Sequence, residues 1–216
     1  MKILVVDDHP LIREAMQHVL SELSDNVILL GAGDVRNALE ILDAQVDIDL
    51  VLLDLSLPGP SGLTAIDMLR ERHPGTPVVV LSASDDQATV IGALDHGAMG
   101  FIPKCSANQL ILNALRLVMA GGVYVPPQAV SGAPLSVPAR PQAASIEALG
   151  LTERQMEVLS LMVQGKPNKL ICRELNLAEG TVKIHVTAIL KALGVSNRTQ
   201  AVIAASHLGL EMGKPA

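Results

Sequence analysis

The chain has 216 residues, of which 49% are hydrophobic but only 1% aromatic, and its formal net charge is −6. This length accommodates one or two domains, and the scarcity of aromatic side chains argues against binding nucleic acid by stacking bases on aromatic rings. Residues 1–122 hold 16 acidic against 7 basic side chains, whereas residues 123–216 hold 6 against 9. We therefore expect only the second half to meet a polyanion, although drift of surface charge would give the same pattern.

Short apolar runs alternate with amphipathic stretches along residues 2–119. The apolar runs are four or five residues long and rich in Val, Ile and Leu, as buried parallel strands are: 2–6, 27–30, 50–53, 78–81 and 99–102. The amphipathic stretches are expected helices: 10–23, 34–44, 62–73, 86–96 and 106–119. Several of them begin at residues suited to N-caps: Asp34, Ser61, Ser84 or Asp85, and Ser106. Five strand–helix repeats predict an α/β doubly wound, five-stranded parallel sheet.

Polar side chains stand where these strands end. Asp7 and Asp8 follow the first strand, Asp54 the third, Ser82 the fourth and Lys104 the fifth. Ligands of doubly wound sheets bind at the carboxyl ends of the strands, and three carboxylates gathered there need a cation such as Mg²⁺, which binds carboxylate and phosphate oxygens. The set suits phosphoryl transfer to a carboxylate, with the ammonium and the hydroxyl stabilising the phosphoryl oxygens. Singly, each residue is more often a cap or a solvated side chain.

Residues 121–148 differ from the segments on either side. They contain five prolines among Ala, Ser, Val and Gln, after a Gly121-Gly122 pair, which is typical of a linker without regular structure. Beyond it, residues 149–216 have helical patterns only. Thr152 caps a helix that ends at Gly165, a second runs from about 168 to 175, a third from about 179 to 193, and a fourth opens at Ser196 or Asn197. Two short helices joined by a tight turn predict a helix-turn-helix within an all-α four-helix domain.

Cysteine usage and hydropathy restrict the cellular setting. Cys105 and Cys172 stand far apart in no CxxC spacing, which argues against a disulfide framework or a zinc site. The first apolar run meets Asp7 too soon for a signal peptide, and no run approaches the roughly 20 apolar residues of a membrane span. We expect a cytoplasmic protein without a membrane partner.

The first 120 residues resemble the receiver domain of two-component response regulators, with a flavodoxin-like fold. The segments that carry the likeness are VVDDHP at 5–10, LLDLSLPGPSG at 52–62, LSAS at 81–84 and GFIPK at 100–104. The resemblance implies that Asp54 accepts a phosphoryl group from a partner histidine kinase. It implies that Mg²⁺ is held by Asp8, Asp54 and the backbone carbonyl of Ser56, with Asp7 acting through water.

The same resemblance implies a switch and a phosphoryl contact. Ser82 and Phe101 would form the switch, and Lys104 would contact the phosphoryl group. Ser82 stands where Thr is commoner, which keeps the hydroxyl. Filling of the core is an alternative role for Phe101, the single Phe of the chain.

Residues 151–210 resemble the LuxR-type helix-turn-helix of NarL/FixJ-type regulators. The matching segments are LTERQMEVL at 151–159, GKPNKLICREL at 165–175, EGTVKIHVTAILKALGV at 179–195 and NRTQAV at 197–202. With the receiver before it, this predicts domains at 1–120 and 149–216, joined by the linker at 121–148. The protein is then expected to be a phosphorylation-dependent transcription regulator that binds double-stranded DNA. It is not expected to be an enzyme, and slow self-dephosphorylation would be its sole reaction.

The third helix of this domain is the expected DNA reader. Val182, Val186, Ile189 and Leu193 form one apolar face by their spacing, and the remaining faces are available to a DNA groove. The resemblance implies base contacts from Lys183, Ile184 and position 187, where Thr stands instead of the Lys of some relatives and suits a base edge or a thymine methyl. Phosphate contacts are expected from residues that position the protein without reading sequence, namely Asn168, Lys169, Thr181 and Lys191. Helix capping by Asn168 and solvation of the lysines are the alternatives.

The fourth helix is expected to mediate a homodimer on DNA, again by resemblance. Its small and apolar residues on one side are Ala201, Val202, Ala205 and Leu208. The alternative is that they only close the four-helix core. Two other functions stay open: a receiver that serves as a constitutive dimerisation or ligand-binding module, and an aspartate-based phosphatase. The phosphatase is disfavoured because its Asp-x-Asp pair is absent from the first strand, where Asp7 and Asp8 are adjacent.

Overall fold

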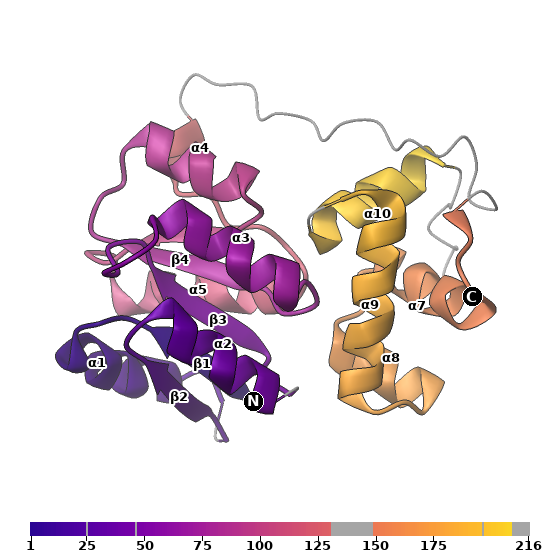
Figure 1. The fold of residues 1–216 in the computed structure, drawn as a ribbon, viewed down its shortest axis with the longest axis horizontal. Helices are drawn as coiled ribbons and strands as arrows, with labels where there is room; N and C mark the ends of the chain where they lie inside the picture. The colour runs from indigo at the N-terminus through magenta and orange to yellow at the C-terminus, as the bar shows by residue number, and fades with distance from the viewer. Residues whose placement is uncertain (25, 46, 131–148, 196, 209–216) are drawn as a thin grey trace. The chain divides into compact units, whose positions relative to one another are not determined.

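The computed structural model describes residues 1–216 except 25, 46, 131–148, 196 and 209–216 (Figure 1). The chain separates into two compact units, Met1–Pro134 and Leu135–Ala216. Each unit has a hydrophobic core built from its own elements.

The first unit is a five-stranded parallel sheet with helices on both faces. Its strands lie in the order β2-β1-β3-β4-β5, and their bounds are β1 (Lys2–Val6), β2 (Ile28–Ala32), β3 (Leu50–Asp54), β4 (Val78–Ser82) and β5 (Gly100–Pro103). The intervening helices are α1 (Pro10–Ser21), α2 (Val35–Ala44), α3 (Gly62–Arg72), α4 (Gln87–Asp95) and α5 (Asn108–Met119). The predicted doubly wound sheet is confirmed.

Alternation along β1 divides the apolar side chains between two cores. Ile3 and Val5 pack on one face with residues of α1 and α5, whereas Leu4 and Val6 pack on the other face with residues of α2, α3 and α4. Successive side chains of a strand point to opposite faces, so a strand covered on both faces must be apolar throughout. This requirement explains the uninterrupted apolar runs.

Two predicted caps prove wrong in this unit, whereas Asp34 and Ser61 are confirmed as N-caps. Asp86 caps α4 in place of Ser84 or Asp85, because its carboxylate accepts from the Thr89 N–H while the Ser84 hydroxyl donates to it. The N-cap of α5 is Ala107, not Ser106, and it makes no side-chain cap bond.

The segment that follows α5 packs on the first unit, in contrast to the expected absence of regular structure from residue 121 onward. The Tyr124 N–H donates to the Met99 carbonyl, and the Phe101 N–H donates to the Tyr124 carbonyl, so this segment pairs with β5. It continues into α6 (Pro127–Val130) beside α4, where Ala129 is buried and its carbonyl accepts from the Gln87 amide. The rest of the predicted linker lies outside the described residues.

The second unit consists of α7 (Glu153–Val163), α8 (Asn168–Leu175), α9 (Glu179–Leu193) and α10 (Arg198–His207). Thr152 caps α7 in a reciprocal capping box with Gln155, and Asn197 caps α10. The turn between α8 and α9 begins at Asn176 in the left-handed conformation, with φ of 51°. The predicted all-α domain with a helix-turn-helix is thereby confirmed within the described residues. No helix in the described part of the chain is long and apolar enough to cross a membrane.

Candidate functional site

The acidic residues meet because β1 and β3 are neighbouring parallel strands in the sheet. Asp7 follows β1 directly, and Asp54 is the last residue of β3, so both stand at the carboxyl edge. Asp7 is 1% exposed and Asp54 2%. A carboxylate oxygen of Asp7 lies within 4.8 Å of one of Asp54, and two buried carboxylates at such a distance repel each other unless a cation lies between them.

Lys104 supplies a cation between them. It follows β5, and its Nζ lies 2.7 Å from Asp7 Oδ2 and 2.7 Å from Asp54 Oδ2. Burial by itself would lower the pKa of Lys104, but the hydrogen bonds and charges of Asp54 and Asp7 outweigh it and hold this pKa above its ordinary value. The ammonium therefore stays protonated at neutral pH and binds two carboxylates at once.

The other predicted residues of this site lie on the same edge. The Ser56 N–H donates to Asp54 Oδ1 at 3.1 Å, which orients the carboxylate. Ser82 ends β4 and is buried, and its Oγ accepts from the Ser84 N–H. Phe101 on β5 pairs in register with Val80 and is fully buried in the core that faces α2, α3 and α4, so the core-filling role is observed for it.

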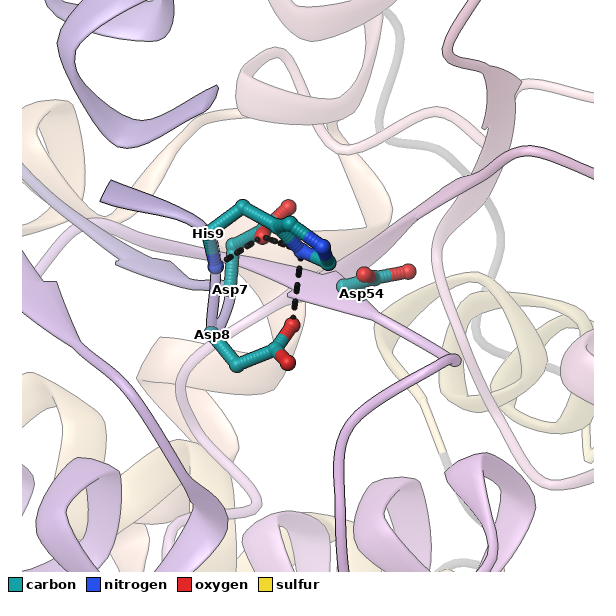
Figure 2. A group of neighbouring side chains, drawn as sticks. All are labelled: Asp7, Asp8, His9 and Asp54. Carbon is teal, nitrogen blue, oxygen red and sulfur yellow. Dashed lines mark hydrogen bonds and ion pairs between the residues drawn. The ribbon is translucent and has the colours of Figure 1, made fainter. Parts of the chain in front are cut away.

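Two residues near Asp7 were missed by sequence reasoning. Arg13 on α1 donates to the Asp7 backbone carbonyl. The His9 ring lies beside the carboxylates of Asp7 and Asp8, with Asp54 on the neighbouring strand (Figure 2). Adjacency of His9 to Asp7-Asp8 was the available signal, but the orientation of its side chain depends on the fold.

The oxygens of this site suit a hard divalent cation. One ligand atom from each of Asp7, Asp8, His9 and Asp54 lies within 4.8 Å of the others. Three carboxylates are only partly neutralised by the single charge of Lys104, and Asp8 remains partly open to solvent. Mg²⁺ binds such sites through one or two carboxylates while keeping waters for exchange with phosphate.

The side chains of α9 in the second unit differ in their exposure from one face of the helix to another. The predicted apolar face of Val182, Val186, Ile189 and Leu193 is confirmed, since all four are buried. Ile184 is 69% exposed, so its side chain is available for contact with DNA. Lys183 is only 9% exposed, so it does not project freely from the helix, in contrast to the expectation that it is available to a DNA groove.

The remaining candidate DNA contacts lie on α8 and α9. Lys169 and Lys191 are exposed, and Thr181 and Thr187 are half-buried. Asn168 is the first residue of α8 after the N-cap Pro167, so it does not cap the helix. Its side-chain oxygen instead accepts from Arg198 of α10, which also donates to the Lys166 carbonyl. Sequence reasoning missed this role of Arg198, whose pKa burial lowers to about 10.

The candidate dimerisation residues of α10 divide into two groups. Ala201 and Ala205 are fully buried in the core of their own unit, so they close the four-helix core, which was the alternative role for this helix. Val202 is half-buried, and Leu208 packs against the edge of that core.

Comparison with known proteins agrees with both halves of this description. Residues 3–116 match the response regulator receiver domain, and residues 149–205 match the bacterial regulatory proteins of the luxR family. The chain is 39% identical over 212 residues to the glycerol metabolism activator of Pseudomonas putida, covering 96% of each chain. It is 33% identical over 201 residues to the nitrate/nitrite response regulator protein NarL of Escherichia coli, covering 93% of each.

A solved structure points the same way. The crystal structure of a LuxR family DNA-binding response regulator from Silicibacter pomeroyi is 30% identical to this chain, covers 59% of it and 98% of the solved chain, and superposes with a TM-score of 0.53. The chain therefore belongs to the two-component response regulators of the NarL/FixJ type, DNA-binding transcription regulators that combine a receiver domain with a LuxR-type helix-turn-helix.

Proposed function

We propose that a partner histidine kinase phosphorylates Asp54 and that this phosphorylation controls DNA binding by the second domain. The observation that carries the proposal is the buried Asp54 carboxylate at the end of β3, with Lys104 Nζ 2.7 Å from it and 2.7 Å from Asp7. A structural ion pair needs one carboxylate, whereas this ammonium binds two. The protein acts in the cytoplasm, where DNA and the kinase are both accessible.

The residues of the site have separate tasks in the transfer. An oxygen of Asp54 forms a bond to phosphorus while the bond from phosphorus to the donor histidine nitrogen breaks, and the electron pair leaves on the imidazole. Lys104 then hydrogen-bonds the phosphoryl oxygens, and the Ser56 N–H holds Asp54 in place. Asp8, Asp54 and the Ser56 carbonyl would hold Mg²⁺, with Asp7 acting through water. The ion supplies positive charge that stabilises the transferring phosphoryl group.

Ser82 and Phe101 connect the site to the rest of the receiver domain. A phosphoryl group adds acceptor oxygens and charge, which would draw the Ser82 hydroxyl inward from the Ser84 N–H. Phe101 would then move into the space released beside β4. The repacked surface releases the DNA-binding domain and favours homodimers on paired half-sites.

In the DNA-binding domain, Ile184 and Thr187 read bases in the major groove and Lys169, Lys191 and Thr181 contact phosphates. Lys183 contacts a base only if its side chain turns outward from its buried position. Asn168 acts with Arg198 to position the start of α8. In dimers, α10 contributes Val202 and Leu208 more than the buried Ala201 and Ala205. The domain limits that we propose, 1–120 and 149–216, leave 121–148 as the connection, whose first part docks on the receiver.

The test is phosphoryl uptake from acetyl phosphate, followed by intact-protein mass spectrometry. Wild type in Mg²⁺ should gain one phosphoryl group and lose it slowly, whereas Asp54→Asn and wild type in chelator should gain none. Uptake by Asp54→Asn would place the phosphoacceptor elsewhere. Rapid, repeated turnover of the donor would instead indicate a phosphatase, and absence of uptake would favour a constitutive module.

A further inference from the structure

His9 brings a nitrogen atom to a site otherwise made of oxygens. Its Nδ1 lies 2.9 Å from Asp8 Oδ1 and 3.3 Å from Asp7 Oδ1. The backbone N–H of the same residue donates to Asp7 Oδ1 at 2.9 Å, so both the main chain and the ring of His9 are directed toward the carboxylates (Figure 2).

The ring is not needed to begin the neighbouring helix. His9 occupies the N-cap position of α1 in extended conformation, but its side chain makes no cap hydrogen bond. Pro10 follows at the first helical position, where the missing N–H reduces the demand for a cap. The imidazole is 64% exposed, so no core packing holds it in place.

The four ligand atoms are close enough to share one ion. With metal–ligand distances of about 2.1 Å, octahedral ligands lie roughly 3 Å apart in cis and about 4.2 Å apart in trans. The atoms offered by Asp7, Asp8, His9 and Asp54 all lie within 4.8 Å of one another. An ion bound here would draw the four atoms inward to these spacings.

Ligand chemistry then distinguishes among divalent ions. Mg²⁺ prefers oxygen ligands and water, whereas imidazole favours ions such as Co²⁺, Ni²⁺ and Zn²⁺. We propose that His9 is a nitrogen ligand of the acidic site, which makes the receiver bind such transition-metal ions more tightly than its carboxylates alone would allow, while Mg²⁺ is held without it. This inference uses the same metal site as the proposed function and depends on that function in no other respect.

The proton balance of ligation is simple. Nδ1 of His9 lies beside two carboxylate oxygens, which only accept hydrogen bonds. A metal ion binds Nδ1 only when that nitrogen carries no proton, so ligation needs the neutral tautomer with its proton on Nε2.

The experiment titrates metal-free full-length protein separately with Co²⁺ and Mg²⁺ and measures binding by calorimetry, with visible absorption as a second readout for Co²⁺. His9→Ala is compared with His18→Ala, a matched control that removes an exposed imidazole from the same helix. His9→Ala should weaken Co²⁺ binding about tenfold or more and leave Mg²⁺ affinity unchanged. His18→Ala should change neither. Proton NMR of the wild-type Co²⁺ complex should show a hyperfine-shifted imidazole N–H signal that His9→Ala lacks.

Three outcomes overturn the inference. Equal Co²⁺ affinity in wild type and His9→Ala shows that the ring is no ligand. Tighter binding of both ions by His9→Ala shows that the ring competes with the metal. Equal weakening of both ions shows that His9 only arranges the loop. These titrations need no phosphorylation, so failure of Asp54 to accept a phosphoryl group would refute the proposed function and leave the test of His9 valid.

Discussion

Replacing Lys104 by Met removes the cation between Asp7 and Asp54 and keeps most of the aliphatic side chain. Breaking a buried ion pair by removing one partner costs about 3–5 kcal/mol, because the other partner keeps an uncompensated charge. The Lys104 side chain is 21% exposed, so water relieves part of this cost. We therefore expect Lys104→Met to lower the free energy of unfolding of the receiver domain by about 3 kcal/mol in chelator, the lower end of that range.

Urea unfolding at pH 7 measures the effect, with hydrogen exchange of β1 and β3 amides used to isolate the receiver transition from that of the second domain. At a slope of about 1–3 kcal/mol per molar urea, the midpoint should fall by about 1–3 M. The control is Lys2→Met, which breaks a more exposed pair with Asp47 and should cost about 0–1 kcal/mol. Saturating Mg²⁺ should reduce the difference in midpoint between wild type and Lys104→Met, because the ion neutralises the same carboxylates.

The pH dependence follows from the raised pKa of Lys104. Because this pKa is higher in the folded than in the unfolded protein, the stabilisation is fully present below the ordinary value of 10.5 and is lost as pH rises through the folded value. Lys104→Met should lack this alkaline component. Equal midpoints for Lys104→Met and Lys2→Met in chelator would refute the reasoning.

Other substitutions test separate parts of the structure. Gly62→Ala should destabilise the receiver by about 1–3 kcal/mol in thermal unfolding, because its Cβ would lie 2.6 Å from the Leu55 backbone; an unchanged midpoint would contradict the packing. Arg198→Met should cost the second domain about 1–3 kcal/mol and weaken DNA binding, since it leaves the Lys166 carbonyl and Asn168 without this donor; undiminished stability and affinity would contradict it. Ile184→Ala should change stability by no more than about 0.5 kcal/mol but weaken specific, not non-specific, DNA binding in anisotropy titrations; equal weakening of both would argue against base contact.

The sheet and its acidic edge were predictable because both follow from local patterns. A strand covered on two faces must be apolar, so residues 50–53 and 78–81 were recognisable as strands. Parallel strands end at one edge, so Asp7, Asp54 and Lys104 were expected together, and the structure places them in direct contact.

Features that depend on packing between distant segments were not predictable. The spacing of Lys183 predicts a surface residue, yet it is buried in the folded domain, because burial is set by tertiary packing that helical spacing does not reveal. Tyr124 follows two glycines and precedes a run of prolines, which indicates a linker, but the open edge of β5 offers backbone partners that no local pattern reveals. The orientation of the His9 ring likewise depends on the turn that joins β1 to α1.

The most direct test of the account is the affinity of full-length protein for its DNA site, measured by anisotropy with and without acetyl phosphate in Mg²⁺, for wild type and Asp54→Asn. Phosphorylated wild type should bind about tenfold or more tightly than unphosphorylated wild type, within the usual range of coupling between two sites. Asp54→Asn should bind weakly with or without the donor. Equal affinity in all four measurements would contradict control of DNA binding by phosphorylation at Asp54.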